Sequence, residues 1–585
     1  MKRTFALLLA LLMAWTLCSA TAEGDRVVAS GVGQGIDGDV VVEVEADAGT
    51  IYRVEVTQQN ETPGIGSVAV EKLPGEIVAA NSILVDDISG ATVTSTAIKT
   101  AIRAALESAG IDPAAFEVEQ AAEETGEKEE VTLDCDVLIV GAGGACLTAA
   151  VRANQDGAKV LVLEKMSFAG GNSLKASGGM NCAGTKFQEA AGITDSGVQE
   201  FIEDTMNGGH QLNDLALVTT MAENSAEAVE WLESIGAPLP KVAATGGTTH
   251  KYLHSPEDGS PVGSYLVAKL SEEAEKQGIE VMLDTTATRL IVNDGAVVGA
   301  LAYDKGHNYT INAKAVILAT GGFGSNFTLM CKYNPSLANA VTTNHPGATG
   351  DGIAMAILVG ADTVDMDQIQ PHPTVYQETS TLVSEKMRSL GAILVNQEGK
   401  RFTNDLSTRD AVSAAELEQT GGYAYIIFDQ NLVDHNKSAQ QYIDLGMAVT
   451  GETYEELAKA MGVDEAAFVE TMNKWNAAVA AGVDEEFGRN NGMDDDLSTA
   501  PYYAIKIAPG IHHTMGGIKI NTDTQVIDTE GNVIPGLYAA GETTGGVHGG
   551  NRIGGNAVCD FVVFGRIAGA NAAQYAAAAE LAPAA

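Results

Sequence analysis

A strand–turn–helix–strand pattern between residues 135 and 164 most strongly constrains how this chain can fold. CDVLIV has the composition of a buried strand, GAGG at residues 141–144 of a tight turn, ACLTAAVRANQDG of a helix and AKVLVLE of a second strand. Glycines at such a turn let backbone N–H groups approach a pyrophosphate, and Glu164 can accept hydrogen bonds from ribose hydroxyls. The pattern predicts a dinucleotide-binding unit. The alternative is a glycine-rich turn in an ordinary α/β domain, and Cys146 stands at the usual third glycine position.

Two further glycine-rich segments lie outside that unit. AGGNSLKASGGMNCAG follows it directly, and GLYAAGETTGG lies near the C-terminal end. A nucleotide-binding domain with a second cofactor-binding segment hundreds of residues away is typical of FAD enzymes, because this long cofactor lies across the whole domain. We therefore predict FAD as the dinucleotide.

The N-terminal segment predicts export. Lys2 and Arg3 precede an apolar run of about thirteen residues, which is too short to span a bilayer comfortably, and Ala20-Thr21-Ala22 forms a small-residue cleavage site. We predict a Sec-type signal peptide over residues 1–22 and a periplasmic, extracellular or cell-surface location. Lipidation at Cys18 is disfavoured, because Trp15-Thr16-Leu17 lacks the small residue usual before a lipidated cysteine.

Charge and cysteine usage exclude several classes of function. The net charge of −43 argues against binding to nucleic acid or to an anionic membrane, and an anionic substrate would need a local basic pocket. None of the six cysteines is spaced as C-x-x-C, so no c-type haem attachment, zinc site or iron–sulfur site is predicted.

A smaller domain precedes the dinucleotide-binding unit. Residues 23–116 contain the strand-like runs DVVVEVEADAG and IYRVEVTQ and a helix predicted over 96–108, and residues 117–131 form an acidic linker. Between them lies DDISGATVTSTAIKT, rich in small and hydroxyl side chains. Taken alone, this string is a polar turn in which Thr94 and Ser95 are good helix N-caps.

From about residue 132 to its end the chain resembles the flavoprotein subunits of fumarate reductase and succinate dehydrogenase. It most closely resembles the soluble flavocytochrome-type fumarate reductases and their urocanate reductase relatives. The matching motifs, in family order, are VGAGGA, GGNS, ASGGMN, ILATGGFG, TGDGI, QPHPTVY, GAILVNQEGKRFTNDLSTRDAVSAA, APGIHHTMGG, YAAGE and HGGNRIGGNA. The resemblance implies an α/β fold (α+β overall): a Rossmann-like FAD-binding domain, 132–366 and 512–585, interrupted by a mobile α+β capping domain, 367–511.

The N-terminal part resembles the small α+β FMN-binding domain of respiratory sodium- and electron-transport complexes. In that family a flavin transferase reads a string that here runs from Asp87 to Thr94, and it attaches FMN through a phosphoester to the last threonine. The resemblance therefore implies covalent FMN at Thr94. The alternative remains a serine- and threonine-rich turn that caps the following helix.

The resemblance also assigns substrate and catalytic roles. Arg552 and His512 would hold a substrate carboxylate, and His372 with Ser384 would lie at the other end of the substrate. Arg409 would protonate the substrate and be reprotonated through Glu385 and Arg388, whose i, i+3 spacing allows contact on a helix. The alternatives are buried histidines that only pack, which we prefer for His513, and an ordinary surface ion pair.

The implied FAD contacts are spread over the chain. Because no histidine lies in KMSFAGGNS, we expect FAD to be non-covalent. Ala287 rests on the loosest alignment. The contacts fall at Ala145, Glu164, Asn172, Ser173, Gly178, Gly179, Ala287, Asp351, Glu542, Ala557 and Val558.

The sequence departs from the fumarate enzymes at the far wall of the substrate site. Leu382 stands where those enzymes tend to have methionine, and a second expected methionine is replaced within Ala243-Ala244-Thr245. The carboxylate clamp and the proton donor are kept. The pattern therefore fits urocanate, acrylate or a cinnamate-like acid as well as fumarate.

Three functions remain open. The first is an exported reductase of α,β-unsaturated carboxylates used in anaerobic respiration, in which a membrane or extracellular donor supplies electrons to FMN and FMN passes them to FAD, without haem. The second is a 3-ketosteroid dehydrogenase-like or aspartate-oxidase-like flavoenzyme of the same fold. The third is an electron-transfer flavin carrier with a degenerate reductase domain, which the intact Arg409, His512 and Arg552 disfavour.

Overall fold

The computed structural model describes residues 26–35, 38–61, 66–88, 91–117, 128–337 and 340–579. The chain divides into two compact units, one up to residue 124 and one from residue 125. The predicted signal peptide with Cys18, most of the predicted linker, and Ser89 and Gly90 lie outside the described residues. Within the described ranges, no helix combines the length and the apolar character needed to cross a bilayer.

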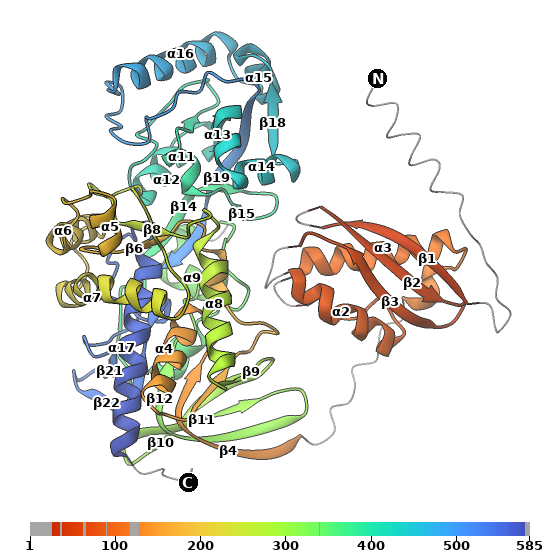
Figure 1. The fold of residues 1–585 in the computed structure, drawn as a ribbon, viewed down its shortest axis with the longest axis vertical. Helices are drawn as coiled ribbons and strands as arrows, with labels where there is room; N and C mark the ends of the chain where they lie inside the picture. Colours follow the sequence, from red (N-terminus) through yellow and green to blue (C-terminus); the bar gives the residue numbers. More distant parts are fainter. Residues whose placement is uncertain are drawn as a thin grey trace. The chain divides into compact units, whose positions relative to one another are not determined.

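The N-terminal unit is a three-stranded antiparallel sheet with helices packed on it (Figure 1). Helix α3 lies against β1, where a Cβ on Gly31 or Gly33 would fall 2.0 Å from the Ala101 or Ala97 carbonyl oxygen, so only glycine permits this approach. The elements are β1 (Val27–Gln34), β2 (Asp39–Ala46), β3 (Ile51–Gln58), α2 (Gly66–Ala80), α3 (Thr92–Ser108) and the 3-10 helix η1 (Pro113–Phe116).

The start of α3 corrects one sequence-based interpretation. The helix begins at Thr92, not at residue 96, and its N-cap is Ala91, with no side-chain cap. Thr94 and Ser95 are therefore not N-caps. Instead, the Ser95 hydroxyl accepts a hydrogen bond from the Ile88 backbone N–H at 3.1 Å and ties the preceding segment to the helix.

The second unit is built on an eight-stranded sheet with a parallel centre. Strand β4 (Glu129–Val140) lies between β12 (His307–Leu318) and β5 (Val160–Leu163), and all three are parallel. Because β4 begins at Glu129, its first residues belong to the sheet and not to the predicted linker. The remaining strands are β9 (Glu280–Met282), β10 (Thr286–Asn293), β11 (Ala296–Tyr303), β21 (Gln525–Ile527) and β22 (Val533–Ala539).

Two helices from opposite ends of this unit pack together on the sheet. Helix α4 (Gly144–Gln155) follows β4 directly, and α17 (Asn556–Ala578) runs alongside it (Figure 1). A Cβ on Gly565 or Gly569 would fall 2.8 or 2.4 Å from an α4 carbonyl oxygen. The Phe561 ring of α17 also lies against Gly144, the first residue of α4.

A separate sheet and its helices fill most of the region between residues 369 and 514. Buried side chains lie on both faces of β17, an interior strand between β16 and β19, which explains its continuous apolar run AYIIF. The sheet comprises β14 (Ile369–Tyr376), β15 (Thr381–Leu382), β16 (Ile393–Val395), β17 (Ala424–Asp429), β18 (Ala448–Gly451) and β19 (Tyr502–Thr514); its helices include α11 (Glu385–Ser389), α12 (Arg409–Leu417), α15 (Tyr454–Met461) and α16 (Glu465–Ala481). The boundaries of the predicted capping domain, residues 367 and 511, stay a prediction.

Candidate active site

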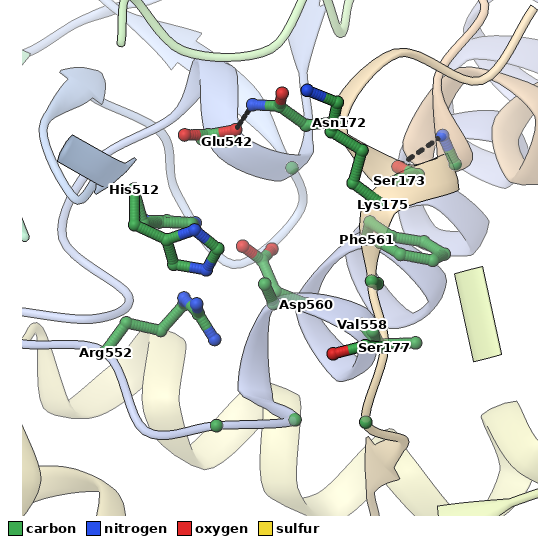
Figure 2. Close-up of a pocket in the computed structure, with 18 of the residues that line it drawn as sticks. Asn172, Ser173, Lys175, Ser177, His512, Glu542, Arg552, Val558, Asp560 and Phe561 are labelled. Carbon is green, nitrogen blue, oxygen red and sulfur yellow. Dashed lines mark hydrogen bonds between the residues drawn. The ribbon is translucent and has the colours of Figure 1, made fainter. Parts of the chain in front are cut away.

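A cavity of about 840 Å³ runs through the second unit. Its lining extends from the glycine turn before α4 to the N-terminal ends of α11 and α12. Residues far apart in the chain meet there: Asn172 donates a hydrogen bond of 3.0 Å to Glu542, and His512 and Arg552 point toward the same space (Figure 2). The cavity is therefore a single site built from both the nucleotide-binding sheet and the second sheet.

The glycine turn at one end of the cavity suits a pyrophosphate. Gly141 has a φ of +105°, and a Cβ there would fall 2.8 Å from the Ala319 carbonyl oxygen. Gly143 is the N-cap of α4 and has no side chain to cap the helix; the Gly144 N–H donates to Ser173 Oγ, and the positive end of the helix dipole lies at the cavity, where it favours an anion. These observations fit the predicted dinucleotide.

Glu164 lies beside this turn. Its carboxylate accepts backbone N–H bonds from Ala142 at 2.8 Å and from Met166 at 2.9 Å, which fix its orientation. Burial nevertheless raises the pKa of Glu164. Each carboxylate oxygen has a second lone pair, so the group can still accept from ribose hydroxyls.

All eleven residues predicted to contact FAD line the cavity. Ser173 accepts a 2.9 Å hydrogen bond from the Gly144 N–H, and Asp351 pairs with Lys165 at 2.7 Å. Ala287, which rested on the loosest alignment, lies at the start of β10 and also borders the cavity. Their position fits FAD; their individual contacts stay a prediction.

We expect Gly143→Ala to weaken FAD binding without disturbing the fold. Gly143 has φ −75°, which alanine accepts, and a Cβ there meets nothing closer than the Gly170 carbonyl oxygen at 3.8 Å. The methyl group would occupy space that a pyrophosphate needs, at a cost of about 1–3 kcal/mol, so the Kd for FAD should rise about tenfold to a hundredfold. Titration of apoprotein followed by flavin fluorescence measures this.

The matched control is Gly75→Ala in the exposed part of α2, where a Cβ meets nothing within 4 Å. This variant should keep the wild-type Kd, and neither variant should lower the melting temperature. An unchanged Kd in Gly143→Ala would mean that the pyrophosphate does not approach this turn.

The other end of the cavity is lined by buried cationic and imidazole groups. The rings of His372 and His512 lie 5.1 Å apart, and Arg552 is buried near them. Burial, together with the Arg409 charge, lowers the pKa of both histidines well below the usual range, so both are neutral at neutral pH. The His372 Nε2 and Arg552 Nε atoms have no hydrogen-bond partner among the described residues. Buried polar atoms of this kind usually meet a ligand or water.

Ser384, predicted to lie near His372, lines the same cavity. As the N-cap of α11 it accepts from the Lys386 backbone N–H at 3.3 Å, and its hydroxyl lies 3.1 Å from that of Ser177. Leu382 and the segment Ala243-Ala244-Thr245 also line the cavity. The departures from the fumarate enzymes therefore lie on the wall of this site.

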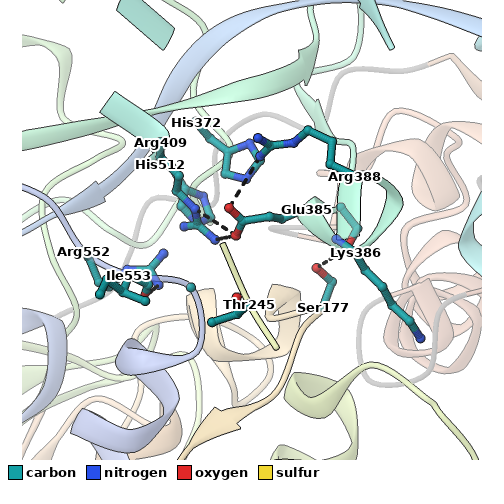
Figure 3. Close-up of polar contacts among 12 residues, drawn as sticks. Ser177, Thr245, His372, Glu385, Lys386, Arg388, Arg409, His512, Arg552 and Ile553 are labelled. Atoms are coloured by element: carbon teal, nitrogen blue, oxygen red, sulfur yellow. Dashed lines mark hydrogen bonds and ion pairs between the residues drawn. The ribbon is translucent and has the colours of Figure 1, made fainter. Parts of the chain in front are cut away.

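Arg409, Glu385 and Arg388 form a chain beside the histidines, in which both arginines are buried and the Glu385 side chain is 11% exposed (Figure 3). Arg409 Nη2 lies 2.8 Å from Glu385 Oε2, and Arg388 Nη2 lies 3.5 Å from Glu385 Oε1. The predicted contact between Glu385 and Arg388 on a helix is thus confirmed. Burial pushes the pKa of Glu385 up, but the two arginine charges outweigh it and lower the pKa. Arg409 and Glu385 line the cavity, whereas Arg388 lies fully buried behind them.

The structure brings in side chains that the sequence did not single out. Gln370 accepts a 3.3 Å hydrogen bond from Arg409 Nη1, and Lys175 donates to the Thr343 carbonyl oxygen at 3.0 Å. Burial lowers the pKa of Lys175 to about 8. His513, for which packing was the preferred interpretation, also lines the cavity; its ring packs edge-on against that of His548 at 5.3 Å, and neither ring nitrogen has a partner among the described residues, so its role stays a prediction. Gln370 lies in the motif QPHPTVY and Lys175 in AGGNSLKASGGMNCAG, so these motifs were the sequence feature that could have pointed to them.

Thr94 belongs to the N-terminal unit. Its side chain is fully buried, and its hydroxyl donates to Glu61 Oε2. Gly66 lies against this pair: a Cβ there would fall 2.7 Å from the Thr94 Oγ1 atom. The hydroxyl is thus held by a carboxylate in a tightly packed corner of the unit.

Comparison with known proteins identifies both units. Residues 136–558 match a family model described as an FAD binding domain, and residues 35–107 match one described as an FMN-binding domain. An NADH:fumarate oxidoreductase of Klebsiella pneumoniae is 43% identical over 92% of this chain, but the chain spans only 56% of that protein. A urocanate reductase of Eggerthella lenta is 37% identical, over 96% of this chain and 94% of its own length.

The solved structures agree with this assignment. The open conformation of a flavocytochrome c3 fumarate reductase matches with a TM-score of 0.65 and 46% identity, over 76% of this chain and 79% of that one. The chain therefore belongs to the fumarate reductase-type family of FAD-binding flavoproteins and carries an FMN-binding domain ahead of its FAD-binding domain.

Proposed function

We propose that the protein is a flavin-dependent reductase of the C=C bond of α,β-unsaturated carboxylates. The observation that carries this proposal is the buried Arg409–Glu385–Arg388 chain, which reaches the same cavity as His372, His512 and Arg552. The names of the relatives, which include fumarate and urocanate reductases, support the same reaction class.

The protein's own residues would bind and polarise the substrate. Arg552 presents a guanidinium fork to one carboxylate, and neutral His512 can donate a further hydrogen bond to it. Because these donors are buried, they stabilise negative charge that develops toward the carboxylate more strongly than water would. FAD, when bound, supplies the hydride that one alkene carbon receives.

The proton for the other alkene carbon would come from Arg409. Guanidinium is a weak acid, so it needs a neighbour that restores its proton at once. Glu385, in contact with both arginines, can take a proton from Arg388 and pass it to Arg409. Burial of both arginines and the low exposure of the Glu385 side chain would limit the access of bulk water to the reacting carbons.

The far wall of the cavity argues for a substrate other than fumarate alone. Leu382 and the segment Ala243-Ala244-Thr245 line the cavity at the positions where methionines are expected in the fumarate enzymes, although Met493 also lines the cavity. A urocanate-, acrylate- or cinnamate-like acid has one carboxylate, so it would need carboxylate-binding residues such as Arg552 and His512 at only one end. We therefore include monocarboxylates in the proposed substrate class.

The N-terminal unit would be the site at which electrons enter the protein. We propose that a flavin transferase attaches FMN at Thr94, that electrons pass from a membrane or extracellular donor through FMN to non-covalent FAD, and that the signal peptide exports the protein. Covalent attachment would prevent loss of a flavin outside the cell. The absence of a C-x-x-C-H motif from the sequence supports FMN, and not haem, in this role.

An anaerobic assay with reduced viologen and a panel of enoates tests the function. The panel contains fumarate, urocanate, acrylate and cinnamate, with a 3-ketosteroid as the competing substrate class. We expect viologen oxidation with at least one enoate and none with the ketosteroid. In a parallel assay that supplies oxidised viologen or another oxidised acceptor, reduction of the acceptor by the ketosteroid, without enoate reduction, would favour a dehydrogenase, and no turnover in either assay with both flavins present would favour an electron carrier.

A further inference from the structure

A second acid lies behind the Arg409–Glu385–Arg388 chain. Glu416, in the last turn of α12, has no exposed surface, and neither of its carboxyl oxygens has a hydrogen-bond partner among the described residues. Buried carboxyl groups without partners are rare, because the loss of hydration is not repaid. The substrate chemistry described above does not use this group.

Glu416 shares one face of α12 with two other buried polar residues. Arg409, Ser413 and Glu416 are spaced i, i+4 and i+7, which aligns them along the helix. The Ser413 hydroxyl is buried and, within the described ranges, also lacks a partner. A line of polar groups therefore runs from the cavity toward the C-terminal end of α12.

Arg388 faces the same region from α11. Its Nη1 donates to the Asp405 carbonyl oxygen and its Nη2 reaches Glu385, but its Nε–H has no partner in the described part of the chain. The Arg409–Glu385 ion pair joins α12 to α11, and Arg388 lies near enough to Glu416 for their charges to interact. Three unsatisfied polar groups, on Arg388, Ser413 and Glu416, thus lie around one interior region. Such clusters in proteins are commonly bridged by buried water.

The electrostatic setting favours a protonated Glu416. Burial raises its pKa well above the usual range, and the charge of Arg388 offsets this only in part. The C-terminal end of a helix carries negative partial charge, which further disfavours a carboxylate in the last turn. A neutral carboxyl can donate a proton, whereas a carboxylate cannot.

We propose that Glu416 is the proton-supplying residue behind Arg388 and that it extends the buried chain of Arg409, Glu385 and Arg388 toward the surface. This inference rests on the proposed reductase function. Glu416 acts through Arg388 and touches neither substrate nor flavin, so it is a positioning residue for proton supply and not a catalytic one. Its neighbours Leu417 and Glu418 are exposed, so solvent lies within one or two residues of it.

One proton moves along this chain in each turnover. Arg409 gives a proton to the substrate carbon and regains one from Glu385, which takes one from Arg388. Arg388 is reprotonated by Glu416 through a bridging water, and Glu416 regains its proton from solvent. No bond other than N–H, O–H and the new C–H changes along this path, and no electrons travel along it.

The test compares Glu416→Gln with Glu418→Gln in the full-length protein loaded with flavin. Both changes remove one carboxyl from α12 and keep side-chain size, but Glu418 is exposed. With an enoate that the wild type reduces, we expect kcat of Glu416→Gln to fall roughly tenfold to a hundredfold, less than the loss of about 10²–10⁴ for a direct general acid. KM and the rate of flavin reduction by viologen should stay unchanged, and the solvent deuterium isotope effect on kcat should increase.

Two further measurements separate proton supply from a structural role. Wild-type protein should show an infrared carbonyl band of a protonated carboxyl that is absent in Glu416→Gln and present in Glu418→Gln. Ser413→Ala, which removes one water ligand but no charge, should lower kcat by a smaller factor in the same direction.

The outcomes are distinguishable. If the wild type reduces an enoate and Glu416→Gln keeps the same kcat, the role of Glu416 in proton supply is overturned, while the proposed reductase function is not. A lower melting temperature with a raised KM and an unchanged isotope effect would make Glu416 structural and overturn it as well. Failure of the wild type to reduce any enoate would overturn the reductase function, and the role of Glu416 with it.

Discussion

Replacing Arg409 with alanine should lower kcat for enoate reduction by at least about 10²-fold and toward 10⁴-fold, the range typical of a direct general acid. Arg409 lines the cavity and lies 2.8 Å from Glu385, so no other described arginine holds the same position between this carboxylate and the substrate. Flavin should still be reduced by viologen, because the FAD-binding turn lies at the other end of the cavity. Steady-state assays and stopped-flow measurement of flavin reoxidation check both points.

Two controls make the result interpretable. Arg289→Ala removes an exposed arginine of β10 and should keep wild-type kcat. Arg409→Lys keeps the charge beside Glu385 and should retain more activity than Arg409→Ala. Removing one partner of a buried ion pair can cost about 3–5 kcal/mol of folding free energy, so FAD content and melting temperature must be measured for each variant. Retention of kcat in Arg409→Ala, with FAD bound, would assign the proton to another donor.

Thr94→Val should abolish the flavin fluorescence that survives denaturing gel electrophoresis. Valine keeps the branched shape that fits beside Gly66 but removes the hydroxyl oxygen to which the phosphoester would be attached. An ester at Oγ1 would also replace the hydrogen bond from Thr94 to Glu61, and the phosphate would repel that carboxylate. Loss of covalent flavin should therefore be complete and not partial.

The matched control is Thr96→Val, on the same helix but exposed, which should keep the full in-gel signal. Non-covalent FAD should remain in Thr94→Val, because it is bound by the other unit. Flavin that still resists denaturation in Thr94→Val would place the attachment at a different residue.

Much of the fold could be predicted from sequence because its signals are local. The alternation of strand, glycine turn, helix and strand between residues 135 and 164 identified β4, α4 and β5, and each motif that lines the cavity is contiguous in the chain. IYRVEVTQ likewise forms β3 over the same residues. Local conformational preference and close backbone approach determine such segments with little help from the rest of the chain.

The errors arose where tertiary contacts override local preference. Thr94 and Ser95 are good N-cap residues, yet the helix starts earlier at Thr92, and both side chains make buried contacts instead. Glu129 lies in an acidic stretch, yet it pairs with His307 and extends β4. In both cases hydrogen bonds to distant residues outweigh the local signal.

The sequence by itself predicted a dinucleotide-binding unit, because a glycine turn between a strand and a helix has short-range physical requirements, and its resemblance to a known family indicated which motifs could hold a carboxylate and a proton donor. Only the tertiary structure decided that Gln370 contacts Arg409 and that Glu416 is buried without a partner. Burial and the pKa shifts that follow depend on which elements pack together, and packing joins residues that the linear sequence keeps far apart.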